Sequence, residues 1–263
     1  MTNKVYAAIL AAMMAAPVCG WAQSAEAADD GLKFSAGADV VSSYVWRGAY
    51  CAGLSAQPSL GLEWKGVSLG AWGSVDLLGY KELDFALGYS IAGFDITVTD
   101  YWWSGEDAYD YFSRFDDNLD GAAIESVTTS KHMFEAALAY TLPIEKFPLK
   151  LAWSTFFAGY DYKLDDDLKP VRAFSSYVEL SLPFTVKSVE LEAALGVRPF
   201  KSPIYESSAN QQSWYSSDFA VVNLSLKASK EIKITDSFSL PLFTQLIFNP
   251  NAEDVFLVVG LSF

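Results

Sequence analysis

Residues 187–198 read Lys-Ser-Val-Glu-Leu-Glu-Ala-Ala-Leu-Gly-Val-Arg, and this stretch decides the fold class. Its apolar side chains recur at every second position, and the positions between them carry charged or small residues. A period of two predicts a β-strand. One face suits lipid and the other suits water, as in the wall of a membrane-spanning barrel.

The same alternation recurs along the chain and predicts about twelve strands. Each is long enough to cross the apolar band of an outer-membrane barrel, which is about 25 Å tall. The expected strands are Phe34 to Arg47, Ser55 to Trp64, Val67 to Leu78, Glu82 to Ala92, Phe94 to Trp103, Lys131 to Leu142, Leu149 to Tyr160, Ala173 to Phe184, Lys187 to Arg198, Phe219 to Lys230, Phe238 to Asn249 and Asp254 to Phe263. The sequence therefore predicts an all-β fold, a transmembrane antiparallel up-and-down β-barrel, over residues 28–263.

The connections between these strands sort by length, as a barrel requires. Every second connection is short: Lys65-Gly66, the Ala92-Gly93 junction, Pro143 to Pro148, Thr185-Val186 and Glu231 to Ser237. The others include three long polar ones: Ser104 to Ser130, Asp161 to Arg172 and Pro199 to Asp218. Barrels of the outer membrane have short periplasmic turns and longer extracellular loops. Both termini are therefore expected in the periplasm.

The N-terminus has the order of residues that is typical of an export signal. Lys4 precedes the apolar run from Val5 to Val18, and small residues follow up to Ala27. The run is too short for a spanning helix, which needs about 20 residues, so residues 1–27 are interpreted as a secretory signal peptide. Cys51 then has no partner for an intramolecular disulfide. The net charge of −14 disfavours nucleic acid as a partner.

Charged side chains on the inward face are the candidates for pore-lining residues. By parity these are Asp39, Arg47, Glu63, Asp76, Asp84, Glu135, Lys150, Glu179, Glu190, Glu192, Arg198 and Lys227, with Asp95 and Gln245 beside them. Charges cannot face lipid without a large cost, and unpaired buried carboxylates are costly too. The surplus of acids over bases therefore favours a hydrated lumen over a barrel that side chains plug. A twelve-stranded barrel is intermediate in width, so both alternatives stay open.

Aromatic residues stand near the strand ends, where membrane headgroups favour amphipathic rings. The candidates for these girdles are Tyr44, Trp46, Trp64, Trp102 and Trp103. The last residue, Phe263, resembles the aromatic C-terminus that outer-membrane barrels present to their assembly machinery. The expected partners are therefore outer-membrane lipid and the barrel assembly machinery.

One region resembles a known family. The stretch from Ala38 to Tyr50 contains Ser42-Ser43-Tyr44-Val45-Trp46-Arg47-Gly48, which is similar to the Ser-x-Tyr-x-aromatic-Arg-Gly block of the TorF-type porin family. Gln57-Pro58, the Gly-x-Trp-Gly-Ser run from Gly70 to Ser74, and Asp100-Tyr101-Trp102-Trp103 are also similar to members of that family. The resemblance covers Ala38 to Trp103. It implies porin-like transport, here the passive passage of small polar solutes or cations.

Two other functions are weighed against a channel. A structural or adhesive barrel with a plugged interior is one of them, and a barrel enzyme such as a phospholipase is the other. His132 is the single histidine, with Ser130 on the same face, but the His-x-Ser order of that phospholipase is absent. We therefore expect no catalytic residues. The acidic connections lack the spacing of an EF-hand loop, so we expect solvated loops and no cofactor.

Overall fold

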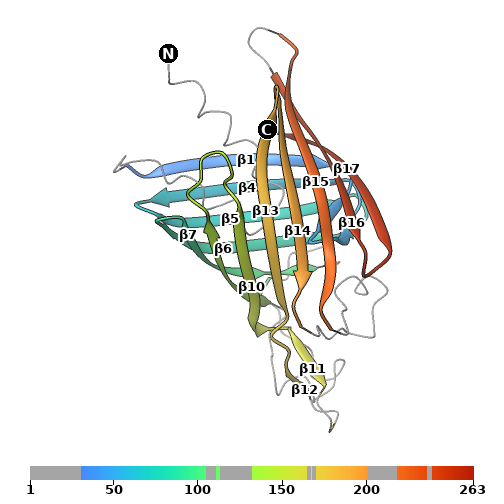
Figure 1. Ribbon diagram of the computed structural model, residues 1–263. Coiled ribbons are helices and arrows are strands. Elements are labelled where there is room, and N and C mark those ends of the chain that lie inside the picture. The colour runs from blue at the N-terminus through green and yellow to red at the C-terminus, as the bar shows by residue number, and fades with distance from the viewer. Residues whose placement is uncertain are drawn as a thin grey trace.

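The computed structural model describes residues 31–104, 111–112, 132–164, 167, 170–200, 218–235 and 239–263. Twelve long antiparallel strands in these ranges form one closed sheet (Figure 1). They are β1 (Lys33–Val41), β4 (Ser55–Trp64), β5 (Val67–Asp76), β6 (Lys81–Ile91), β7 (Phe94–Tyr101), β9 (Met133–Thr141), β10 (Lys150–Gly159), β13 (Ser176–Val186), β14 (Val189–Arg198), β15 (Ala220–Lys233), β16 (Ser239–Asn249) and β17 (Asp254–Ser262).

The barrel closes between its first and last strands. β1 pairs with β17 in a register that sets Asp39 opposite Ser262, and each of the other long strands pairs with its neighbours along the chain. Phe263 continues this seam, because its backbone N–H donates to the Ala38 carbonyl at 2.9 Å. The predicted twelve-stranded up-and-down barrel is confirmed.

Alternation along the wall separates an apolar outer face from a polar inner face. On β4, Ser55 and Gln57 are buried toward the lumen, whereas Leu60 and Leu62 are exposed on the outside. A chain with this period presents its apolar residues to lipid and its polar residues to the interior. None of the described residues forms a helix with the length and hydropathy of a membrane span.

Short hairpin turns join the strands at one end of the barrel. Lys65 and Gly66 have φ values of 50° and 82°, and Ala92 and Gly93 have 52° and 83°. Positive φ at both central residues is typical of the type I′ turn, whose twist matches that of the flanking strands. The C-terminus lies at this end, opposite the small hairpin of β11 (Tyr162–Leu164) and β12 (Pro170–Arg172) (Figure 1).

Several predicted boundaries are wrong. β15 continues to Lys233, three residues into the connection expected over Glu231 to Ser237. The turn expected at Thr185-Val186 lies at Lys187-Ser188, because β13 continues to Val186 and the positive φ of 59° is at Lys187. The strand expected to run unbroken from Phe34 to Arg47 leaves the wall after Val41. Its remaining residues form β2 (Tyr44–Trp46), which pairs with β3 (Ala49–Ala52).

Smaller irregularities mark the outer end of the wall. β8 (Trp103–Ser104) extends β7 along β6 in the same register, because Glu82 pairs with Trp103. The strand predicted over Phe94 to Trp103 is therefore interrupted at Trp102 but keeps its direction. Most of the long connections at this end lie outside the described residues.

Candidate functional site

The connection between β1 and β4 folds into the barrel as a hairpin. We call residues 44–52, which comprise β2, β3 and the turn between them, the lumen hairpin. Its turn is Arg47-Gly48, with φ values of 51° and 79°, which are those of a type I′ turn. Tyr44, Trp46 and Ala52 are at most 5% exposed, so the barrel wall surrounds the hairpin.

The tip of the lumen hairpin touches β15 and β16, which lie three and two places from β1 in the sheet. A Cβ atom added at Gly48 would overlap the backbone carbonyl of Val222 on β15. The Asn249 Nδ2 group of β16 donates a hydrogen bond to the Gly48 carbonyl at 3.0 Å. The hairpin thus begins beside β1 and reaches two strands that are distant from β1 in the sequence.

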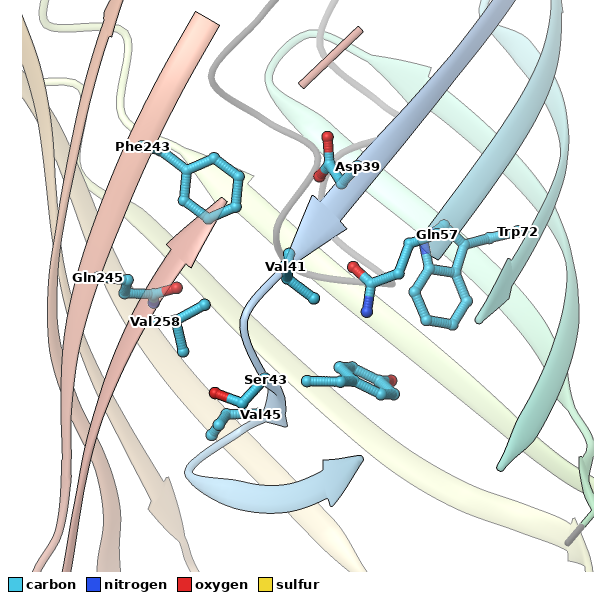
Figure 2. A pocket seen from close by; sticks show the side chains of 10 residues that line it. Asp39, Val41, Ser43, Val45, Gln57, Trp72, Phe243, Gln245 and Val258 are labelled. Carbon is cyan, nitrogen blue, oxygen red and sulfur yellow. The ribbon is translucent and has the colours of Figure 1, made fainter. Parts of the chain in front are cut away.

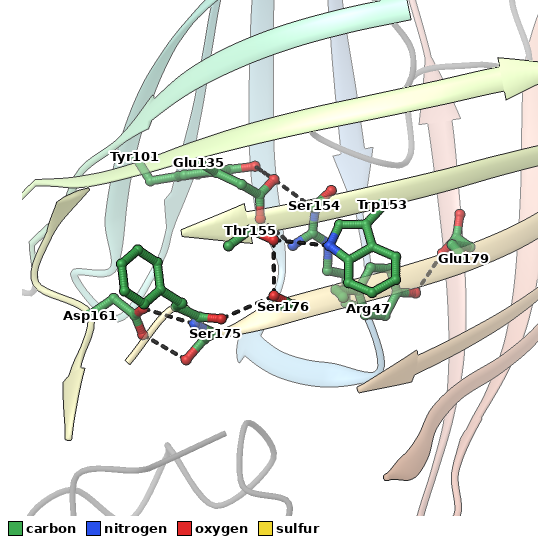
Figure 3. Close-up of polar contacts among 12 residues, drawn as sticks. Arg47, Tyr101, Glu135, Trp153, Ser154, Thr155, Asp161, Ser175, Ser176 and Glu179 are labelled. Atoms are coloured by element: carbon green, nitrogen blue, oxygen red, sulfur yellow. Dashed lines mark hydrogen bonds and ion pairs between the residues drawn. The ribbon is translucent and has the colours of Figure 1, made fainter. Parts of the chain in front are cut away.

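A buried ion pair holds the side chain at the tip. The Arg47 guanidinium donates to both carboxylate oxygens of Glu135 on β9, at 2.6 and 2.9 Å, and to the Ser154 hydroxyl at 3.1 Å (Figure 3). The two side chains are 8% and 1% exposed. Bidentate pairs of this kind fix geometry as well as charge. Burial alone lowers the pKa of Arg47, but the Glu135 carboxylate outweighs it and the net pKa is raised.

Aromatic rings complete the packing around the hairpin. The Arg47 guanidinium lies 4.6 Å from the ring centres of Trp46 and Tyr177, within the range of cation–π attraction. Trp46 in turn packs against Tyr101, with ring centres 5.3 Å apart, and Trp103 stacks on Tyr101. These rings therefore narrow the outer half of the lumen.

The predicted pore-lining residues fall into two groups by burial. Those that are buried within the barrel are Asp39, Asp84, Asp95, Glu135, Lys150, Arg198 and Lys227. Those that are partly exposed are Glu63, Asp76, Glu179, Glu190 and Glu192, together with Gln245. Arg47 belongs to the lumen hairpin and not to the wall, which corrects its predicted place on the first strand.

Several of the wall charges already have partners. Lys150 forms an ion pair with Asp95 at 3.2 Å, and Lys227 lies opposite Glu192 in the sheet register. Asp76 accepts hydrogen bonds from two backbone N–H groups in the turn that follows it, so it shapes the connection at the rim. Each such pair uses one basic and one acidic residue, so the surplus of acidic residues on the inward face remains.

A fully buried inward carboxylate was missed from the sequence. Glu82 is fully buried two positions before Asp84 and accepts a hydrogen bond from the Tyr80 hydroxyl at 2.6 Å. Parity on the predicted strand Glu82 to Ala92 gives it the same face as Asp84, so the signal was present. Among the described residues, no three His, Cys, Asp or Glu side chains are arranged to hold a metal ion. Most of the acidic loop residues lie outside those ranges.

The girdle prediction needs correction at four of its five residues. Tyr44 and Trp46 are inside the lumen, where they pack with Tyr101 at the end of β7. Trp103 packs against these rings. Trp102 is fully buried and lies beside Tyr111, so protein covers it. Trp64 is 52% exposed beside a short turn, as a girdle residue should be. Other rings at that end belong to Tyr89, Phe94 and Tyr140, which lie on the same outward parity.

His132 has both ring nitrogens engaged. Nδ1 lies 2.7 Å from Asp100 Oδ1, and Nε2 lies 2.6 Å from the backbone carbonyl oxygen of Tyr111. The Tyr111 hydroxyl donates to the other oxygen of Asp100 at 2.6 Å. These contacts hold Tyr111 against Asp100 and His132 at the end of the barrel. Neither ring nitrogen of His132 is left to bind a serine hydroxyl. Ser130 lies outside the described residues.

Comparisons with known proteins give distant likenesses. No family model matches the chain, and no curated protein matches its sequence. The chain is similar to OmpF of Salmonella typhi, solved in a complex with daunomycin, with 8% identity and a TM-score of 0.34 over 90% of this chain and 99% of that one. An outer membrane channel of Pseudomonas putida F1 gives 15% identity and a TM-score of 0.43, over 91% and 98% of the two chains. OccD3 of Pseudomonas aeruginosa gives 12% identity and a TM-score of 0.37, over 90% of this chain and 66% of that one. Likenesses with TM-scores below 0.5 assign no solute and no activity.

Proposed function

We propose that this protein is an outer-membrane channel for the passive passage of small polar solutes, and that the lumen hairpin is its constriction. The observation that carries the proposal is the pairing of an apolar outer face with a polar lumen around the hairpin. A barrel whose interior merely needed filling could use apolar side chains, which cost less to bury than charges do.

The distribution of exposure supports a vestibule below the constriction. Glu63, Glu190 and Glu192 stand near the short turns and are partly exposed, whereas Glu135 at the hairpin tip is buried. Water therefore reaches the periplasmic half of the inward face more readily than the hairpin level. A solute would meet its main resistance at the lumen hairpin.

The same hairpin favours one alternative, a plugged structural or adhesive barrel. Its tip is tied to Glu135 and contacts Val222, so the outer half of the lumen is well packed. Swelling of liposomes that contain the purified protein separates the two functions. A channel should admit a small sugar and exclude a large oligosaccharide, whereas a plugged barrel should admit neither. No swelling with folded, heat-modifiable protein would reject the channel.

The acidic vestibule should make the channel favour cations. Carboxylates in a narrow lumen raise the local cation concentration. Replacing Glu190 and Glu192 by Gln should shift the reversal potential toward anions in a salt gradient, more strongly at low salt, where screening is weaker. Glu190→Gln should contribute more than Glu192→Gln, because Lys227 already faces Glu192. Glu253→Gln, on an exposed turn, is the control, and equal shifts from the control would contradict this role.

Phe263 is proposed as the contact for the barrel assembly machinery. Its side chain is 62% exposed while its backbone closes the seam with Ala38. Phe263→Ala keeps the backbone and should lower the yield in the outer membrane, and Phe263→Tyr should restore it. A normal yield of the Ala variant, measured by membrane fractionation, would exclude a role for the ring.

Export and localisation complete the proposal. Residues 1–27 are proposed as the signal peptide that directs the chain to the outer membrane, and they lie outside the described residues. A barrel enzyme has the least support of the alternatives, because both ring nitrogens of His132 are engaged within the protein.

A further inference from the structure

Two carboxyl groups lie side by side at the outer end of the barrel interior. Glu82 and Asp84 are 0% and 3% exposed, and they are two positions apart on the inward face of β6. Side chains at alternate positions of a strand point to the same side. Here the two carboxyl groups are within hydrogen-bonding distance of each other. Two buried carboxylates at such a distance cannot both stay ionised without a large cost.

Neither carboxyl group is neutralised by a cation. Within the described ranges, no ion pair involves Glu82 or Asp84. Arg47 lies near Tyr101, which is next to the two groups, but it is bound to Glu135. If both groups are ionised, the two oxygens of Asp84 and the Oε1 atom of Glu82 have no donor in that part of the chain. A carboxylate can only accept hydrogen bonds, so a single proton between the two groups supplies the donor.

The lumen hairpin covers these two carboxyl groups. Its side chains Tyr44 and Cys51 both interact electrostatically with them. Trp72, which is opposite Asp84 in the sheet register, packs against Tyr44 with ring centres 5.4 Å apart. Figure 2 shows Trp72 on the inner side of the wall beside Gln57. The seated hairpin therefore keeps water away from the carboxyl groups.

The ionisable groups that surround the two carboxyl groups supply no positive charge. On β5 the opposing residues are Trp72 and Ser74, which do not titrate. The other neighbours are phenols, a thiol and a carboxylate, namely Tyr44 and Cys51 on the hairpin, Tyr80 before β6, Asp100 and Tyr101 on β7, and Tyr111. A second negative charge at Glu82 and Asp84 would therefore have nothing to offset it except water.

We propose that Glu82 and Asp84 share one proton at neutral pH, and that loss of this proton to water at alkaline pH releases the lumen hairpin. Two adjacent carboxylates repel each other, and hydration relieves the repulsion only if the hairpin moves away. The seated state holds one proton more than the released state, so seating weakens as the pH rises. This switch rests on the proposed function, because release of the constriction should raise the conductance of the channel.

Infrared spectroscopy of the full chain in detergent micelles tests the shared proton. A protonated carboxylic acid has a C=O stretch above the amide bands, and an ionised carboxylate has none there. The difference spectrum between the wild type and Asp84→Asn at neutral pH should contain this band, and the band should disappear at alkaline pH. Glu82→Gln gives the same test if Asp84→Asn does not fold. A difference spectrum without the band would overturn the proposal.

Hydrogen exchange of residues 44–52, followed by mass spectrometry, tests the release of the hairpin. At each pH the wild type is compared with Asp84→Asn, so that the intrinsic pH dependence of exchange and the titration of Tyr44 and Cys51 cancel. The exchange rate of the wild type relative to the variant should rise by about tenfold per pH unit once the proton is lost, because one proton is linked to seating. Glu63→Gln, at an inward carboxylate beside the short turn at Lys65-Gly66, is the control and should behave as the wild type does.

The outcomes for the switch and for the channel can be told apart. A relative exchange rate that does not change with pH would overturn the switch, and liposome swelling by the same protein would leave the channel function intact. A relative exchange rate that rises with pH, in a protein that causes no swelling at neutral or alkaline pH, would support the switch and reject the channel.

Discussion

Gly48→Ala is expected to displace the tip of the lumen hairpin and open the channel. Gly48 has a φ of 79°, and its added Cβ would overlap the Val222 carbonyl, so the variant meets both backbone strain and a steric clash. Left-handed strain costs about 1–2 kcal/mol, and overpacking costs about 1–3 kcal/mol. The free energy that seats the hairpin should therefore fall by at least about 2 kcal/mol, and single-channel conductance should rise.

Cys51 reports the position of the hairpin directly. Burial raises the pKa of the Cys51 thiol, so little reactive thiolate forms at neutral pH while the hairpin is seated. Release into water should lower that pKa toward its ordinary value and speed maleimide labelling of Cys51. Gly53→Ala is the control, because the nearest atom to its added Cβ is the Tyr50 hydroxyl at 3.6 Å. Labelling of Gly48→Ala at the rate of the wild type would show that the tip tolerates the methyl group.

Arg47→Ala is expected to be the most destabilising single substitution in the lumen hairpin. It leaves Glu135, which is 1% exposed, without its bidentate partner. Removing one member of a buried ion pair costs about 3–5 kcal/mol, because the remaining charge is left uncompensated. Guanidinium unfolding of the protein in detergent micelles, followed by intrinsic fluorescence, measures the loss.

A second substitution tests why Arg47→Ala is destabilising. If the uncompensated carboxylate is what destabilises Arg47→Ala, then adding Glu135→Gln should recover part of the lost stability. Arg47→Lys keeps the charge but loses the bidentate geometry, so its free energy of unfolding should lie between those of the wild type and Arg47→Ala. Equal stability of Arg47→Ala and the wild type would mean that the ion pair contributes nothing to the fold.

The wall of the barrel could be predicted because its cause is local. Alternation of side chains sets which face meets lipid, and turn residues such as Lys65-Gly66 set where each strand ends. Parity therefore identified Asp84 and Glu135 as inward residues before any contact was known. The same rule could have found Glu82, which lies on the face of Asp84.

The lumen hairpin could have been suspected from two features of its own sequence. A strand from Phe34 to Arg47 is longer than the roughly 9–11 residues that cross a bilayer. Arg47-Gly48 lies between two short runs of apolar and aromatic residues, which is the position of a two-residue turn. Neither feature says on which side of the wall the hairpin would lie.

The barrel follows from local sequence alone, because period-two alternation fixes each strand through neighbouring residues. The direction of the lumen hairpin depends on tertiary contacts, because Tyr44 and Trp46 share one face of β2 as they would on a wall strand. The contacts that draw it inward come from far along the chain: Glu135 lies 88 positions after Arg47, and Asn249 lies 201 positions after Gly48. Closure of the barrel between β1 and β17 encloses the hairpin among these partners, and a local pattern carries no information about them.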